Sequence, residues 1–439
     1  MSISARLAAF LARRGLHYGW VVVATTFLTM LVTAAAVGAP GVLLLPLQRE
    51  FGWSTAAISS ALATRLVLFG LMGPFAAAFI NRFGMRNVTM CALALIGSGF
   101  ALSLAMKHLW QLLLLWGLVV GVGTGLTALV LAATVSLRWF SSRRGLIVGL
   151  LTASSATGQL VFLPLLAWVA TRAGWRSALL IICALLAAAA LLVRCFMRDH
   201  PADLGLQPFG AAPSTVPVAP AGPAASPAEP ASIGGAALSA LREASRNSTF
   251  WILFGTFFIC GASTNGLIQT HFIPLCSDMG LPEVAAASVL ATMGVFDFIG
   301  TVASGWLSDR YNPARLLFWY YGLRGLSLIY LPFAAFTYPG LSMFALFYGL
   351  DWIATVPPTV NLTVKTFGRD KANLVFGWIF AGHQLGAACA ALGAGISRTV
   401  LQSYLPAFFV SGALCIMAAG LSLNLGSNRS NRRANAQSA

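Results

Sequence analysis

The feature that most constrains this chain is a series of apolar runs, each long enough to cross a lipid bilayer. A bilayer core about 30 Å thick needs about 20 apolar helical residues for each crossing. Only 9% of the 439 residues are charged, whereas soluble domains average about 25%. We therefore predict an all-α membrane protein with twelve transmembrane helices, at approximately 18–45, 54–80, 87–106, 109–137, 145–170, 176–196, 250–275, 284–307, 313–336, 340–364, 373–397 and 403–425.

The net charge of +16 reports topology rather than nucleic-acid binding. If the N-terminus lies inside, most of the 27 Lys and Arg residues fall in cytoplasmic segments. The opposite side receives only Arg49, Lys107, Arg172, Arg176 and Arg398. This asymmetry follows the positive-inside rule and predicts that both termini are cytoplasmic.

Other local signals are few. The first apolar run is too long for a secretory signal, and residues 3–14 could form an amphipathic helix on the inner membrane surface. The seven cysteines are scattered, without metal-ligand or disulfide spacing. We therefore expect no cofactor and no metal.

An Ala/Pro-rich stretch divides the chain into two halves of six helices. Residues 201–231 hold eight of the twenty prolines, a composition typical of an extended or disordered linker. We expect an N-terminal bundle at 1–198, a cytoplasmic linker at 199–248, a C-terminal bundle at 249–426 and a cytoplasmic tail at 427–439.

A short loop motif recurs at corresponding points of the two halves. "NRFGMR" contains Asn81 and Arg82, and "DRYNPAR" contains Asp309 and Arg310. Internal repeats of this kind are typical of secondary transporters, whose substrate site lies between the halves. With its six-plus-six layout, the chain resembles the major facilitator superfamily, whose loop motif is well kept as "GWLSDRYNPAR". The resemblance assigns both loops a role in conformational change, although Asn81 replaces the family's aspartate.

Within that superfamily the chain is most similar to the monocarboxylate transporter group. Gly19-Trp20 matches the group's first-helix signature, and "WFSSRRGLIVGLLTASSATG" matches its fifth-helix signature with Ser142 in place of a lysine. The group often has Asp and Arg four residues apart in the eighth helix. Here Asp297 is present, but Thr301 occupies the arginine position.

Asp297 and Arg324 are predicted to lie at the same depth in the membrane. Asp297 is about 18 Å from Asp309, and Arg324 is about 16 Å from the start of the next helix at Pro313. A charge near the bilayer centre costs about 2.5–3.5 kcal/mol, so we expect the two side chains to pair. A substrate anion that displaced Asp297 from Arg324 would let this carboxylate take up a proton. The alternative is a static ion pair that fastens two helices.

Four groups of polar residues complete the candidate site. Asp351 is a second candidate for proton coupling, and His383 could bind substrate, although an Asp351–His383 or His383–Gln384 contact that locks two helices is the equal alternative. Arg65 could attract an anion or extend toward the lipid headgroups. Asn265 and Gln269, with His271 nearby, could line a cavity.

We therefore predict a secondary transporter rather than an enzyme, because no metal cluster or nucleophile–base spacing is evident. The resemblance implies proton-coupled symport of a small organic anion, such as a monocarboxylate. We expect the protein to lie in a bacterial inner membrane. Its partners would be the substrate, protons and the lipid bilayer, and not nucleic acid. The alternative is transport of a larger or uncharged metabolite, such as a vitamin or siderophore, or export of a metabolite.

Overall fold

The computed structural model describes residues 3–127, 129–211 and 233–437, which are helical almost throughout. Twelve helical segments follow the predicted order. The first three segments of the first half are α2 (Gly19–Phe51), α3 (Thr55–Phe83) and α4 (Met85–Ser103). The fourth consists of α5 (Leu109–Leu112), η1 (Leu113–Val120), α6 (Gly121–Thr127) and α7 (Leu129–Trp139). The last two are α8 (Arg144–Ala173) and α9 (Trp175–Phe196).

The second half has the same number of segments. The first consists of α11 (Ser248–Gly261), η3 (Ala262–Ile268) and α12 (Gln269–Asp278). The next three are α13 (Glu283–Arg310), α14 (Pro313–Tyr330) with the turn η4 (Leu331–Phe333), and α15 (Tyr338–Asp351) together with α16 (Val356–Phe367). The last two are α17 (Arg369–Leu401) and α18 (Leu405–Gln437).

Ten of the segments among the described residues are long and apolar enough to cross a membrane by themselves. The other two are α8, whose apolar stretch Val161–Ala173 is shorter, and α14, which carries Arg315 and Arg324. The tenth predicted segment is two helices, α15 and α16, separated by residues 352–355.

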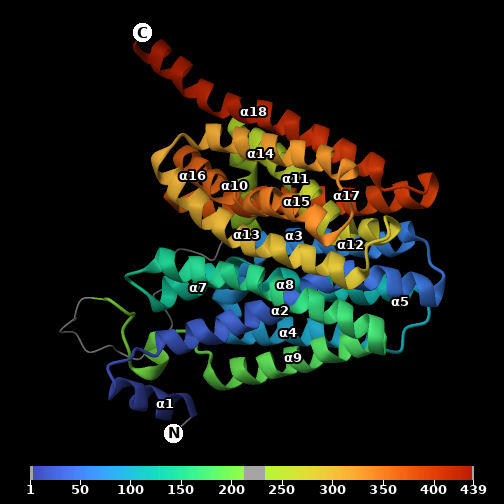
Figure 1. The fold of residues 1–439 in the computed structure, drawn as a ribbon. Coiled ribbons are helices and arrows are strands. Elements are labelled where there is room, and N and C mark those ends of the chain that lie inside the picture. The colour runs from blue at the N-terminus through green and yellow to red at the C-terminus, as the bar shows by residue number, and fades with distance from the viewer. Residues whose placement is uncertain (1–2, 128, 212–232, 438–439) are drawn as a thin grey trace.

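The two halves form two bundles that pack side by side, the first coloured blue to green and the second yellow to red (Figure 1). They meet where α3 packs against α17, α8 against α13, and α2 against α12. At the end where α2 stops, Arg49 pairs with Glu283 of the other half at 2.7 Å, and the Ala56 N–H donates to Thr399 Oγ1 at 3.0 Å. These bonds hold the bundles together at that end.

The chain segment that connects the two bundles contains more regular structure than its Ala/Pro-rich composition indicated. Residues 212–232 lie outside the described residues, but Pro201–Leu204 form a short helical turn, η2, and the Phe209 N–H donates to the Trp139 carbonyl at 2.9 Å. Helix α10 (Ile233–Ala244) contacts both α3 and α17. It is held by a 2.8 Å hydrogen bond from Trp378 Nε1 to the Ala237 carbonyl. The N-terminal segment forms the predicted short helix, α1 (Ile3–Ala12).

Glycines set the closest approaches between helices. Gly117, Gly121 and Gly125, spaced four residues apart, pack directly against α3, as expected for small residues at a helix interface. In the second half Gly300 of α13 lies against the Leu350 carbonyl of α15 so closely that no Cβ would fit. This contact positions α13 beside the end of α15.

We predict that Gly300→Ala destabilises the protein by about 1–3 kcal/mol, because the added methyl group overlaps the backbone of α15. Thermal unfolding of detergent-purified protein measures the effect. Gly305→Ala is the matched control in the same helix, since nothing lies within 4 Å of its added methyl group and alanine favours helices. Equal melting temperatures for the two variants would contradict the packing argument.

Candidate functional site

The candidate site is a cavity of about 200 Å³ between the two halves. Helices α2, α3 and α6 line it from the first half, and α11, η3, α12, α16, α17 and the break after α15 line it from the second. The described residues that line it are neutral polar, aromatic or aliphatic: Met30, Thr33, Ala34, Val37, Phe69, Thr124, Thr127, Phe257, Cys260, Thr264, Asn265, Gln269, Trp352, Ile353, Val356, Phe376, Phe380, His383 and Gln384.

One wall of the cavity is the break between α15 and α16. Pro357 and Pro358 have no N–H to donate, so the helical ladder that would continue α15 is interrupted. The backbone groups that lose their helical partners at this break, residues 352–355, need other partners, because there is no water in the membrane core to satisfy them.

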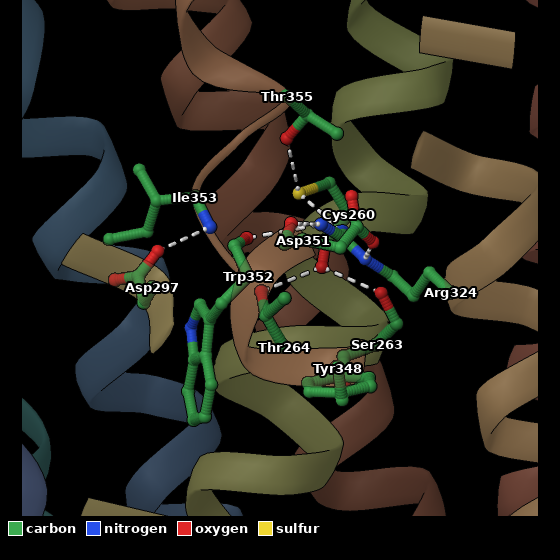
Figure 2. A network of polar contacts seen from close by, with 10 residues as sticks. All are labelled: Cys260, Ser263, Thr264, Asp297, Arg324, Tyr348, Asp351, Trp352, Ile353 and Thr355. Atoms are coloured by element: carbon green, nitrogen blue, oxygen red, sulfur yellow. Dashed lines mark hydrogen bonds and ion pairs between the residues drawn. The ribbon is translucent and has the colours of Figure 1, made fainter. Parts of the chain in front are cut away.

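Arg324 of α14 satisfies the carbonyl side of this break (Figure 2). Its Nη2 donates to the carbonyls of Asp351 and Trp352, at 2.5 and 3.0 Å. Its Nε donates to Asp351 Oδ2 at 2.7 Å, and its Nη1 donates to Cys260 Sγ at 2.9 Å. The side chain is completely buried and is surrounded by acceptors.

Two side chains of α13 satisfy the other side of the break. Asp297 Oδ1 accepts the Ile353 N–H at 2.9 Å and the Thr301 hydroxyl at 3.0 Å. The Ser304 hydroxyl donates to the Ala354 carbonyl at 2.5 Å. The carboxylate of Asp297 and the guanidinium of Arg324 therefore hold the same interruption from two sides, as Figure 2 shows for the bonds at Trp352 and Ile353.

The predicted Asp297–Arg324 ion pair is wrong, and the partner of Arg324 is Asp351. The prediction assumed that α13 and α14 are neighbours because a short loop joins them. Helix α13 instead packs mainly on α15 and α8, and α14 packs mainly on α18. The exchange in which a substrate anion displaces Asp297 from Arg324 therefore has no starting point in this structure.

The sequence did not single out Cys260 or the residues of the break. Cys260 lines the cavity, receives the Arg324 hydrogen bond and lies 3.3 Å from Thr355 Oγ1. Trp352 and Ile353 also line the cavity while their backbone groups bind Arg324 and Asp297. Two sequence features mark this region, namely Asp351 and the consecutive prolines Pro357 and Pro358, which cannot donate to a helical ladder.

Arg65 lies inside the protein rather than at the headgroups, with 5% of its surface exposed. Its Nη1 donates to the carbonyls of Ala36 and Val37, at 3.4 and 3.1 Å. Pro40 in α2 cannot donate to the Ala36 carbonyl four residues earlier. Arg65 thus satisfies a carbonyl group that a proline releases, and it does not line the cavity.

His383, Asn265 and Gln269 line the cavity, as predicted, and Gln384 lines it as well. Neither alternative contact of His383 forms: its Nδ1 and both polar atoms of the Gln384 side chain are buried without a protein partner. His271 faces elsewhere, with its Nε2 2.8 Å from the Ala391 carbonyl.

The loop-motif residues lie away from the cavity. The Arg310 guanidinium lies 4.1 Å from the centre of the Trp306 ring, and that of Arg82 lies 5.4 Å from the Phe83 ring. The side chains of Asn81 and Asp309 are outside the described part of the structure, so their predicted role stays a prediction.

We predict that Arg324→Met destabilises the protein by about 3–5 kcal/mol, because it leaves Asp351 buried and unpaired. Adding Asp351→Asn should recover part of the loss. Arg398→Met is the control: its pair with Asp278 is partly exposed, so the cost should stay below about 1 kcal/mol. Thermal unfolding in detergent measures all three variants, and similar losses for Arg324→Met and Arg398→Met would refute a special role for the buried pair.

Comparison with known proteins places this geometry in a family. The family model of the Major Facilitator Superfamily matches residues 26–391. Monocarboxylate transporter 13 of Bos taurus is 26% identical over 412 residues, covering 93% of this chain and 89% of the relative. The uncharacterized MFS-type transporter YcxA of Bacillus subtilis is 25% identical over 387 residues, covering 86% and 87%.

A solved structure shares the fold. A bacterial homolog of the human lysosomal transporter Spinster, in an inward-facing and occupied conformation, superimposes with a TM-score of 0.68 at 14% identity, covering 92% of this chain and 96% of that one. The family match, the two six-helix bundles and the cavity between them agree, and this chain belongs to the major facilitator superfamily of membrane transporters.

Proposed function

We propose that this chain is a secondary transporter that carries a small carboxylic acid together with a proton across the bacterial inner membrane. The observation that carries the proposal is the neutral lining of the cavity between the halves. Its size supports a small substrate, because about 200 Å³ is below the range of about 300–1,000 Å³ that is usual for drug-sized ligands. Several relatives are monocarboxylate transporters by name, which supports the same class.

The neutral lining supports proton coupling. An anion taken alone into this cavity would have no lysine or arginine beside it, since the described lining residues include neither. Burying an unpaired charge costs several kcal/mol. A proton that travels with the acid removes this cost and leaves the loaded carrier without added charge.

Arg324 does not act as the substrate's cation in this conformation. Asp351, two carbonyls and Cys260 occupy its hydrogen-bonding groups, and it is fully buried. Its role is to hold the break between α15 and α16, so that Trp352 and Ile353 form a wall of the cavity. A substrate in contact with this wall therefore touches the break between α15 and α16, where the helical hydrogen bonds are already interrupted.

Transport would follow from rocking of the two halves around the cavity, as is general for this architecture. The bonds Arg49–Glu283 and Ala56–Thr399 join the halves at one end and must open when the cavity faces that side. The distribution of basic residues favours assigning this end to the outside and both termini to the cytoplasm.

An uncharged metabolite is the second candidate, and the same neutral lining favours it. Such a substrate would need no proton to enter the cavity. Proton movement therefore separates the two candidates.

We predict that liposomes containing the purified protein and a pH-sensitive dye acidify internally when one member of a panel of monocarboxylic acids is added outside. Empty liposomes measure the passive leak of each acid. Ala34→Trp is the second control, because the larger side chain fills the cavity. Protein-dependent uptake of neutral metabolites with no proton movement for any acid would replace the proposal with the second candidate.

A further inference from the structure

Gln384 is a buried amide with nothing in the protein to bind. Its side chain lines the cavity, 1% of the residue's surface is exposed, and neither Nε2 nor Oε1 has a protein partner. Buried polar groups are almost always hydrogen-bonded, and an unsatisfied one costs about 1–3 kcal/mol. Retaining an amide at this place is explained if a ligand completes its bonds.

The two atoms of this amide restrict what the ligand can be. Nε2 needs an acceptor, and the adjacent Oε1 needs a donor. A protonated carboxyl group presents both, a carbonyl oxygen beside a hydroxyl, and so does a carboxamide. An ionised carboxylate has only acceptors, so it would bind Nε2 and leave Oε1 facing a second oxygen.

The surroundings of Gln384 restrict the rest of the ligand. Phe380, one helical turn earlier, stacks on His383 with the ring centres 5.7 Å apart and the planes 10° apart. The Phe69 ring of the other half meets Phe380 edge-on at 5.8 Å, and the Phe257 ring lies 4.9 Å from His383. These rings form an aromatic wall beside the amide, and planar ring systems pack well against such a wall.

We infer that Gln384 is the head-group site of the transporter, and that it binds an aromatic carboxylic acid in its protonated form through a paired donor–acceptor contact. The inference rests on the proposed function and names its substrate class. The acid gains its proton from water on one side of the membrane and returns it to water on the other. The transported proton is thus carried by the substrate and not by Asp297 or Asp351, whose carboxylates hold the break between α15 and α16.

Binding of benzoate and benzamide to the detergent-purified protein tests this inference, because benzamide has the shape and the donor–acceptor edge of benzoic acid but no charge. Isothermal titration calorimetry between pH 5 and pH 8 measures both. We expect benzamide to bind equally at every pH, and the apparent affinity for benzoate to fall about tenfold for each pH unit. Benzoate binding that does not change with pH, together with no binding of benzamide, would overturn the inference.

The variant Gln384→Leu tests the residue itself. It removes both hydrogen-bonding atoms at similar size, so binding of both probes should weaken at least tenfold. It breaks no bond within the protein, so the melting temperature should be kept. Gln48→Leu is the matched control, since Gln48 bonds Thr55 away from the cavity. Unchanged binding in Gln384→Leu would remove Gln384 from the site.

The variant Asp297→Asn tests where the proton travels. Asparagine keeps an oxygen that can accept the Ile353 N–H, so the variant should fold and should still acidify liposomes in the presence of a transported aromatic acid. Acid uptake without proton movement in this variant would place the proton on Asp297 and overturn the inference. Failure of the proposed function is distinct, because then no acid moves protons even through the unchanged protein.

Discussion

The arrangement at the centre of the second half depends on one constraint, the need to satisfy the backbone groups released where α15 stops. In a membrane interior such groups cannot form hydrogen bonds with water. Arg324 takes two of the released carbonyls and Asp297 takes an N–H, so charged side chains serve as partners for backbone. The cavity wall at Trp352 and Ile353 exists because these bonds hold it.

The first half uses the same solution at a different helix. Pro40 releases the Ala36 carbonyl of α2, and Arg65 of α3 donates to it. Both buried arginines thus bind backbone carbonyls of neighbouring helices: Arg65 binds one that Pro40 releases, and Arg324 binds two where α15 ends. Arginine suits the task because its guanidinium carries five donors and can bind several carbonyls at once.

Because these charged side chains bind backbone, the described residues that line the cavity include no Lys, Arg, Asp or Glu, and they offer amides, hydroxyls and aromatic rings. Gln384 and His383 lie on α17, which packs against α3 of the other half. Residues of α2, α3 and α6 line the same cavity from the first bundle.

The sequence alone determined the all-helical membrane fold, the order of its twelve segments and the presence of Asp297, Arg324 and Asp351 at membrane depth, because hydropathy and residue spacing along one helix are local properties. It also pointed to His383, Asn265 and Gln269 as cavity groups. Only the tertiary structure decided the partners. Arg324 pairs with Asp351 and not Asp297 because α13 and α14, although consecutive in the chain, pack on different helices. Which faces meet depends on close packing over the whole surface of each helix, such as Gly300 against α15, and the spacing of residues within one helix does not contain that information.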